Sequence, residues 1–340
     1  MFRLILLLLT LQTGTVFAAV TSKTINKNQI KGLRKLLKGL DSGVFTTCNI
    51  VFFSELVTYD EADERCRNFD IGSGRGEEGN LATVNDGDKN KDLKILLEMA
   101  YPLAKQEGNQ WVDTKWVWAG LRKTKNNENK KPGKYNTLDW EWADGSHPED
   151  FSKWMKKQPD QRPLKKGKSG CDQDWCYQNQ MRINHGGRWD DTYKFKTHPY
   201  ACDYRGKYVL SNEKMTWVKA KKACAQAGLH LAKVRNAAEV DEVTNAAKYF
   251  LGAADPAWKT WDSNNWIWLG GNDLEEEGVW KWLDGDLVED WVVPWRPKSG
   301  KDNARNKQHV LAISRWGEFD DSFHKKKSRK RPFACQCPGS

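Results

Sequence analysis

Trp116-Val117-Trp118-Ala119-Gly120 and Trp266-Ile267-Trp268-Leu269-Gly270 are two copies of one motif, and together they decide the fold. In each copy large apolar side chains alternate with their neighbours, as in a half-buried strand. Further motifs recur around them in the same order: Thr58-Tyr59-x-x-Ala62-x-x-x-Cys66 and Thr216-Trp217-x-x-Ala220-x-x-x-Cys224, Asn80-Leu81-Ala82-Thr83-Val84 and His230-Leu231-Ala232-Lys233-Val234, Trp140-Glu141-Trp142-Ala143-Asp144-Gly145 and Trp280-Lys281-Trp282-Leu283-Asp284-Gly285, Gly187-Arg188-Trp189-Asp190-Asp191 and Gly317-Glu318-Phe319-Asp320-Asp321, Pro199-Tyr200-Ala201-Cys202 and Pro332-Phe333-Ala334-Cys335. Such self-similarity indicates a duplicated domain, with its joint near residues 203–207.

Each repeat predicts the same succession of elements. A short amphipathic helix runs into Cys66 and into Cys224, and a second helix is expected over 89–103 and 237–251. The Trp-x-Trp motifs predict strands, and the Asp-Gly pair after the second of them predicts a turn. A long polar stretch with Gly and Pro follows, and loops of that kind usually carry function. The predicted class is α+β.

These motifs resemble those of C-type lectin-like domains. That family shows a helix ending in a cysteine, a Trp-Ile-Gly-Leu strand, a Glu/Gln-Pro-Asn/Asp loop, a Trp-Asn-Asp strand and a final cysteine. Trp118-Ala119-Gly120-Leu121 is similar to its strand motif, whereas Trp268-Leu269-Gly270-Gly271 departs at the last residue. The resemblance covers nearly all of the chain from Cys48 to Cys337. It implies two tandem domains, residues 46–203 and 204–340, each with two helices, small antiparallel sheets and a long loop region, linked by disulfides.

The first residues predict export. Arg3 precedes an apolar run from Leu4 to Leu11, too short to span a bilayer, and Val16-Phe17-Ala18 offers small residues at the positions that a signal peptidase reads. We therefore expect a signal peptide over 1–18, a basic leader over 19–45, and a secreted, extracellular protein without a membrane span. The chain has 8 cysteines, all in the mature part, and an even number in a secreted chain predicts disulfides. The family resemblance implies the pairs Cys66–Cys202 and Cys224–Cys335. The pairing of Cys48, Cys171, Cys176 and Cys337 stays open.

Gln158-Pro159-Asp160 resembles the family's sugar-binding loop in its Gln-Pro-Asp form. The resemblance implies a calcium site in the first domain, with oxygen ligands from Gln158, Asp160, Asp174, Asp190 and Asp191. Calcium takes about 6–8 oxygen ligands, so sugar hydroxyls would complete the set. The Gln-Pro-Asp form goes with galactose or N-acetylgalactosamine, contacted by Gln158, Asp160, Asp174 and Asp190, with Trp175 as the candidate stacking aromatic. Asp190 departs from the family's Asn, which removes an amide donor to the sugar.

The second domain shows a degenerate site. Arg296-Pro297-Lys298 stands for Gln158-Pro159-Asp160, and Lys307 stands for Asp174. Cations in place of ligands repel a divalent metal, so no calcium is expected there. The basic residues of this loop could contact an anion, or they could form ion pairs with Asp320 and Asp321. They are Arg296, Lys298, Lys301, Arg305 and Lys307. The formal net charge of +10 also favours sulfated or other anionic polymers as partners.

Other classes are less favoured. None of the common hydrolase, metalloprotease or phosphate-loop motifs occurs, which argues against an enzyme, and no nucleic-acid partner is expected. A zinc site from Cys171, Cys176, His185 and His198 has plausible spacing, but cysteines in an oxidising compartment form disulfides more readily than zinc sites. The main alternative to a lectin is an extracellular matrix protein, or a module that binds proteins or polyanions, built on the same fold.

Overall fold

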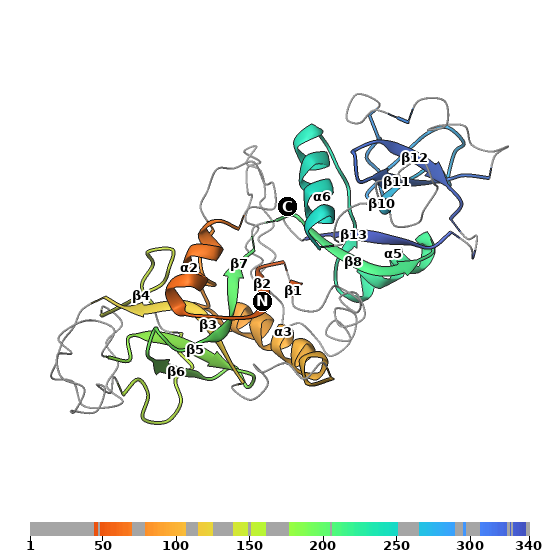
Figure 1. Cartoon of the computed structure of the whole chain (residues 1–340). Coiled ribbons are helices and arrows are strands. Elements are labelled where there is room, and N and C mark those ends of the chain that lie inside the picture. The colour runs from red at the N-terminus through yellow and green to blue at the C-terminus, as the bar shows by residue number, and fades with distance from the viewer. Residues whose placement is uncertain are drawn as a thin grey trace, which may run out of the picture.

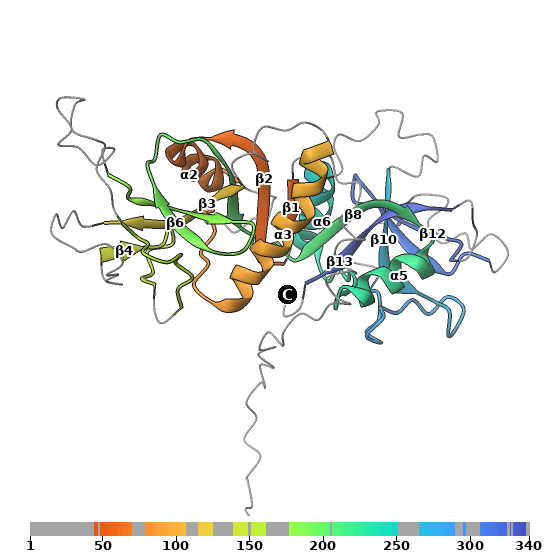
Figure 2. The same cartoon turned by 90° about the horizontal axis from the view of Figure 1, so that it is seen from below.

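The structure is a computed structural model. It describes residues 44–46, 48–69, 79–106, 115–124, 139–148, 151–160, 177–204, 206–250, 265–289, 295–296, 307–324, 327 and 329–337. The chain forms two lobes, each with a sheet and two helices (Figures 1 and 2). We call the described residues up to 204 the first unit and those from 206 onward the second unit. The expected signal peptide and leader lie outside the described residues, apart from residues 44 and 45.

The first unit holds a seven-stranded sheet in the order β1-β2-β7-β3-β5-β6, with β4 paired to β3. Its elements are β1 (Val44–Thr46), β2 (Ile50–Val57), α2 (Tyr59–Arg67), α3 (Gly87–Gln106), β3 (Trp116–Lys123), β4 (Trp140–Glu141), β5 (Gln180–Asn184), β6 (Trp189–Thr192) and β7 (His198–Asp203). All its strand pairs are antiparallel except β3 and β7, which run parallel with Trp118 beside Tyr200.

The second unit holds a six-stranded sheet in the order β12-β11-β10-β13-β8, with β9 paired to β13. Its elements are β8 (Tyr208–Met215), α5 (Trp217–Gln226), β9 (His230–Leu231), α6 (Ala237–Phe250), β10 (Trp266–Asn272), β11 (Val310–Ser314), β12 (Phe319–Ser322) and β13 (Arg331–Gln336). Here β10 and β13 are the parallel pair, with Trp268 beside Phe333. The α+β prediction is confirmed, and each sheet is mixed at one strand pair rather than wholly antiparallel.

The four helices begin and end close to the predicted positions. Thr58 caps α2 in a capping box, since its amide donates to Glu61 Oε2 at 2.9 Å and its side chain accepts from the Glu61 amide. Thr216 occupies the same place before α5 but makes no side-chain cap hydrogen bond. Lys219 stands where Glu61 does in the first unit, so the reciprocal half of a capping box is absent as well. The packing alanines Ala62 and Ala220 are fully buried, as the repeat predicts.

Tryptophan side chains tie the central strand of each unit to its first long strand. The indole nitrogen of Trp118 donates to Val57 O at 2.9 Å, and that of Trp268 donates to Met215 O at 2.8 Å. A second aromatic group packs around Trp189, against Trp142, Phe151 and Trp154, with centroid separations of 5.7 Å. Phe319 takes the place of Trp189 in the second unit, and Trp282 and Trp295 pack on it. The duplication therefore extends to individual core contacts.

Disulfides close each unit and join the two. Cys66 pairs with Cys202 and Cys224 with Cys335, so the first helix of each unit is bonded to its last strand, as the resemblance implied. Cys48 pairs with Cys337, across a sequence separation of 289. This bond ties the start of the first unit to the end of the second. Cys171 and Cys176 lie outside the described residues. Within the described part of the chain, no helix is long and apolar enough to cross a membrane.

Gly120 and Gly270 sit where two backbones meet. Their amides donate to Ala82 O and Ala232 O, at 3.0 and 2.8 Å. A Cβ on Gly120 would lie 2.6 Å from Leu81 O, and one on Gly270 would lie 2.9 Å from Leu231 O. These distances are too short for a carbon to occupy, so the motif needs glycine for close approach rather than for an unusual φ.

We predict that Gly120→Ala destabilises the first unit by about 1–3 kcal/mol, the usual cost of forcing extra atoms into a packed site. Urea unfolding followed by tryptophan fluorescence measures the change. Gly87→Ala is the matched control, because its Cβ would meet only Phe151 Cε2 at 3.7 Å. Equal stability of Gly120→Ala and the parent chain would contradict this packing argument.

Candidate functional site

The loop that carries Gln158, Pro159 and Asp160 packs against β6. Trp154 and Trp189 form a parallel bridge, and the Met155 amide donates to Trp189 O at 2.9 Å. The chain then turns through Lys157, which has a left-handed φ of 68°, and the Gln158 amide donates back to Met155 O at 3.0 Å. The Gln158–Pro159 peptide bond is cis. The turn thus places Gln158 and Asp160 beside the strand that carries Asp190 and Asp191.

Three of the five expected calcium ligands meet at this loop. The Asp160 amide donates to Gln158 Oε1 at 2.9 Å and to Asp191 Oδ1 at 3.1 Å. One N–H therefore gathers an amide oxygen and a carboxylate oxygen from two separate segments. The Asp191 side chain is buried and Asp160 is partly buried. The Gln158 amide oxygen and an Asp191 carboxylate oxygen thus lie together at the Asp160 backbone N–H, and both are oxygen donors of the kind that a hard cation selects.

Asp190 is engaged elsewhere. Its Oδ2 accepts from Arg182 Nε at 3.0 Å and from Arg182 Nη2 at 2.7 Å, across the β5–β6 pair. Successive residues of a strand point to opposite faces, which is why Asp190 and Asp191 have different partners. The Arg182 guanidinium also lies over the Trp116 ring, 4.2 Å from its centroid. Asp174 and Trp175 lie outside the described residues.

His198 completes the cluster around Arg182. Arg182 Nη1 lies 3.3 Å from His198 Nε2, and the imidazole packs on Trp118 at a centroid distance of 4.6 Å. Burial, together with the Arg182 and Lys196 charges, lowers the pKa of His198 to about 3. The ring is therefore neutral at physiological pH, and Nε2 can accept from the guanidinium.

The second unit holds a guanidinium at the same place but takes it from a different strand. Arg331 stands at the position of His198, and Ala312 stands at the position of Arg182. The Arg331 guanidinium lies 4.7 Å from the Trp268 centroid and donates to Ser322 Oγ at 3.3 Å. Burial lowers the pKa of Arg331, while the Asp320 carboxylate opposes that shift. Both units thus keep an arginine beside the first aspartate of the Asp-Asp pair.

In the second unit, Arg296 does not occupy the position that the sequence alignment with the first unit suggests. Trp295 bridges Phe319 as Trp154 bridges Trp189, and the Arg296 amide donates to Phe319 O at 2.9 Å. Arg296 therefore occupies the place of Met155, so matching it with Gln158 was wrong. The strand bridge fixes the register from the tryptophan, whereas the two prolines lie at different distances from it.

The strand register also gives the first-unit counterpart of Lys307, another basic residue of this loop. The register of β11 with β12 and of β5 with β6 places Lys307 at the position of Tyr177, not of Asp174. The Arg296 guanidinium lies over Trp266, 5.8 Å from the ring centroid, and Lys307 is exposed. Lys298, Lys301 and Arg305 lie outside the described residues.

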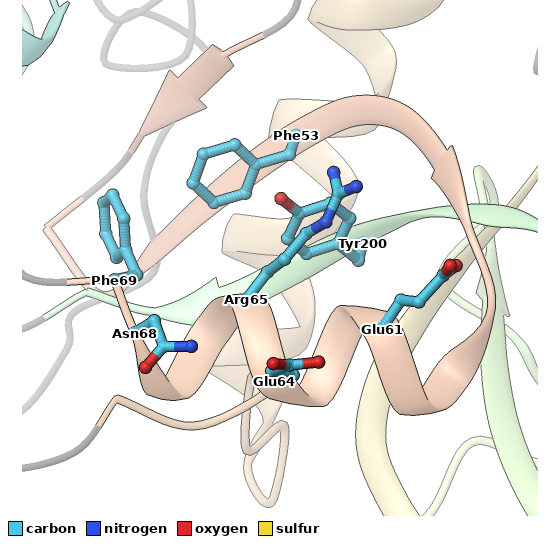
Figure 3. A pocket seen from close by; sticks show the side chains of 7 residues that line it. All are labelled: Phe53, Glu61, Glu64, Arg65, Asn68, Phe69 and Tyr200. Atoms are coloured by element: carbon cyan, nitrogen blue, oxygen red, sulfur yellow. The ribbon is translucent and has the colours of Figure 1, made fainter.

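A groove on the first unit lies between α2, β2 and β7 (Figure 3). Phe53 stacks on Tyr200 at a centroid distance of 4.8 Å, and Phe69 packs edge-on against Phe53. Glu61, Glu64, Arg65 and Asn68 complete its lining. None of the expected ligands lines this groove, so it is separate from the Gln158 loop.

Comparison with known proteins relates part of this chain to a known domain family. The Lectin C-type domain family matches residues 213–337, which make up most of the second unit. The first unit shares its strand order, disulfide and tryptophan contacts. The second unit is a C-type lectin-like domain, and the first unit repeats its fold.

Among curated relatives, the chain is similar to "C-type mannose receptor 2" of Mus musculus, 24% identical over 209 residues, which are 52% of this chain and 12% of that protein. It is also similar to "Galactose-specific lectin nattectin" of Thalassophryne nattereri, 34% identical over 78 residues, which are 23% of this chain and 43% of that one. The chain thus spans less than half the length of these relatives. Among solved structures, the mouse scavenger receptor C-type lectin carbohydrate-recognition domain is 23% identical, with a TM-score of 0.30, and covers 38% of this chain and 86% of its own.

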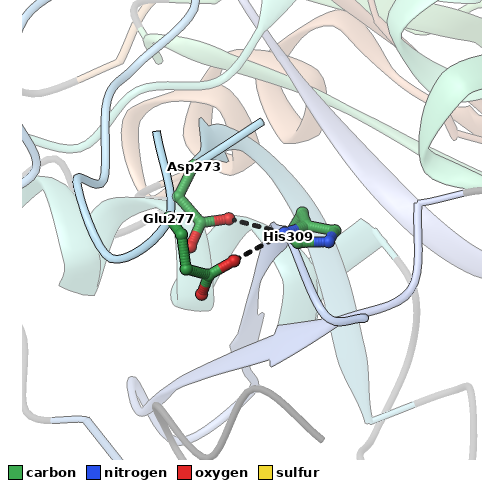
Figure 4. A group of neighbouring side chains, drawn as sticks. All are labelled: Asp273, Glu277 and His309. Atoms are coloured by element: carbon green, nitrogen blue, oxygen red, sulfur yellow. Dashed lines mark hydrogen bonds and ion pairs between the residues drawn. The ribbon is translucent and has the colours of Figure 1, made fainter. Parts of the chain in front are cut away.

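Two features of these lectin-like units were not predicted from the sequence. One is the Arg182–Asp190 pair, which the alternation of β5 and β6 could have suggested once their register was known. The other is a group of two carboxylates and an imidazole in the second unit, formed by Asp273, Glu277 and His309 (Figure 4). Its signal is an Asp-x-x-x-Glu spacing after the central strand together with a histidine before the next strand.

We predict that Arg182→Ala destabilises the first unit by about 2–3 kcal/mol. Removing one partner of a buried ion pair costs about 3–5 kcal/mol, and the Arg182 side chain is 21% exposed, which reduces that cost. The double variant Arg182→Ala, His198→Arg reproduces the arrangement of the second unit and should recover at least half of the loss. Urea unfolding measures both variants. A loss below about 0.5 kcal/mol for Arg182→Ala, the range of a plain surface change, would contradict this role.

Proposed function

We propose that this chain is a secreted lectin that binds terminal galactose or N-acetylgalactosamine through a calcium ion held by the first unit. One observation carries the proposal: the Asp160 amide gathers Gln158 Oε1 and Asp191 Oδ1, at 2.9 and 3.1 Å. The proposed organisation is a signal peptide over 1–18, a leader over 19–45, and domains over 46–203 and 204–340. Its activity is binding rather than catalysis.

The residues present fit calcium. Gln158, Asp160 and Asp191 would supply an amide oxygen and carboxylate oxygens, and Asp174 is a further proposed ligand on the same loop region. Asp190 is a proposed ligand too, and its contribution depends on how far it leaves Arg182. The bound ion would supply a Lewis-acidic centre for two neighbouring sugar hydroxyls. Gln158 and the carboxylates would accept hydrogen bonds from those same hydroxyls, and Trp175 is the proposed stacking residue.

The Arg182–Asp190 pair limits the repulsion among the proposed ligands. Four carboxylates in one site would repel one another, and this repulsion acts strongly where water is scarce. Arg182 cancels the charge of Asp190, so the group of Gln158, Asp160 and Asp191 keeps a modest net charge. An arginine at this place also brings N–H donors near the position where the family's Asn would offer its amide.

The comparisons favour a sugar ligand, because the matched family is a lectin family and one relative is described as a galactose-specific lectin. We propose that the second unit binds no calcium at its corresponding loop, because the charge of Arg296 there would repel a divalent cation. The Arg296 guanidinium, which lies over Trp266, and the exposed Lys307 favour an anionic ligand, such as a sulfated glycan. An extracellular matrix or polyanion-binding role through these residues is the second candidate function.

We predict that the mature chain is retained on immobilised galactose in calcium buffer and released by a chelator. Asp160→Asn should weaken calcium binding at least about tenfold and abolish retention, because ligand charge sets calcium affinity. Calcium affinity is measured by isothermal titration calorimetry. Asp60→Asn is the matched control, since that exposed carboxylate lies at the start of α2 and pairs with Lys194 at 3.0 Å.

The outcomes separate the two candidate functions. Flow-through in calcium by a correctly folded chain would contradict the galactose assignment. Binding to heparin-like columns that falls smoothly with salt, and is indifferent to chelator, would favour the anionic alternative.

A further inference from the structure

The two units carry opposite charges at equivalent positions of their first helices, α2 and α5. Each helix contains the cysteine that bonds to the last strand of its unit, and this cysteine aligns the two helices. Glu61 then corresponds to Lys219, and Glu64 corresponds to Lys222. All four residues are exposed, and none of them forms an ion pair with another described residue. The charge reversal therefore has no counterpart inside either unit.

The groove of the first unit lies against the same helix (Figure 3). Aromatic rings line it, because Phe53 stacks on Tyr200 at a centroid distance of 4.8 Å and Phe69 packs edge-on against Phe53 at 5.2 Å. Glu61 and Glu64 line it from α2. The groove thus combines aromatic surface with two carboxylates that no described cation neutralises.

The duplicated fold does not require this groove. The second unit has Ser211 in place of Phe53 and Ala227 in place of Phe69. Both smaller residues are buried, and the same frame folds around them. The aromatic rings and the carboxylates are therefore particular to the first unit, and they occur together. This combination points to a partner with apolar surface and positive charge.

The exposed face of α5 has that chemistry. Val218, Lys222 and Ala225 are all exposed, and their i, i+4, i+7 spacing puts them on one stripe of the helix. Val218 is 42% exposed, an unusual exposure for a large apolar side chain. Lys219 and Lys221 lie beside this stripe. The face of α5 thus offers apolar side chains among lysines, as the groove offers aromatic rings among carboxylates.

We propose that the groove of one copy of this chain receives the exposed face of α5 from a second copy. The helices α2 and α5 lie in different lobes in both views, so a contact between them joins two molecules (Figures 1 and 2). In this contact Glu61 and Glu64 pair with Lys219 and Lys222, and Val218 packs on the aromatic rings.

The proposed contact is heterologous, because it joins two different surfaces. Repetition of such a contact closes a ring or extends a chain of molecules. Exposed ion pairs each contribute little, so the association is weak and depends on concentration. It brings several first units together, which raises the avidity for any ligand that they bind. It needs neither calcium nor sugar, so it stands independently of the proposed function.

The test is sedimentation velocity of the full disulfide-bonded chain over a range of concentrations at physiological ionic strength. There the Debye length is about 8 Å, so the repulsion from the net charge of +10 is largely screened while contacting pairs still act. We expect reversible, concentration-dependent oligomers. Glu64→Lys and Lys222→Glu should each weaken association at least about tenfold, because each places like charges opposite one another. An equimolar mixture of the two variants should regain the association, because opposite charges then meet again.

Matched variants keep the result interpretable. Each substitution installs the residue type that the other unit carries at the equivalent position, so both variants should fold, and thermal unfolding checks this. Glu64 is chosen rather than Glu61 because Glu61 closes the capping box of α2. Lys248→Glu, at an exposed position of α6, changes the net charge as Lys222→Glu does and should associate like the parent chain.

Three outcomes overturn the proposal. The first is a chain that stays monomeric at every concentration. The second is association that survives both charge reversals, since the interface then lies elsewhere. The third is loss of association in both variants without recovery on mixing, because Glu64 and Lys222 then do not face each other across one interface.

Discussion

The hydrogen bond from the central-strand tryptophan to the end of the preceding long strand is the contact on which both units depend. Trp118 donates to Val57 O and Trp268 to Met215 O, so each indole fixes the strand that leads into the first helix. Gly120 and Gly270, which lie on the central strands, let the Leu-Ala segments approach those strands. A buried indole N–H usually finds a hydrogen-bond partner, and here that partner is the end of the neighbouring long strand. The β5–β6 and β11–β12 hairpins, which carry the paired aspartates, extend from this frame.

The two units use this frame for different chemistry. In the first, a loop packed on Trp189 presents Gln158 and Asp160 to Asp191, and the group consists of oxygen donors. In the second, the matching loop begins with Arg296 on Trp266, and a group of two carboxylates and an imidazole lies instead at the other end of the hairpin, around Asp273 and His309. The arginine beside the first aspartate is kept in both, although Arg182 comes from β5 and Arg331 from β13. The same neighbourhood of arginine and aspartate is thus built from two different strands.

Much of this could be predicted from the sequence, because the duplication supplies two readings of each element. The four helices, the α+β class and the family follow from motifs whose residue types are fixed by packing. The sequence could not show that Asp190 pairs with Arg182, since that depends on strand register. The sequence also suggested a wrong alignment of Pro159 with Pro297. The correspondence between the two loops is set by the bridges that Trp154 and Trp295 form, not by the prolines. Asp273, Glu277 and His309 come together only when the strand ends are placed side by side.

We propose that the first unit gathers its oxygen donors around one ion and that the second unit lacks that group. A crystal structure of the full chain grown with calcium, analysed for anomalous difference density, tests this most directly. The account predicts a peak about 2.3–2.6 Å from oxygens of Gln158, Asp160 and Asp191, and none at the loop that follows Trp295. An ion bound at the second loop, or a Gln158 loop that stays without one at saturating calcium, would contradict it.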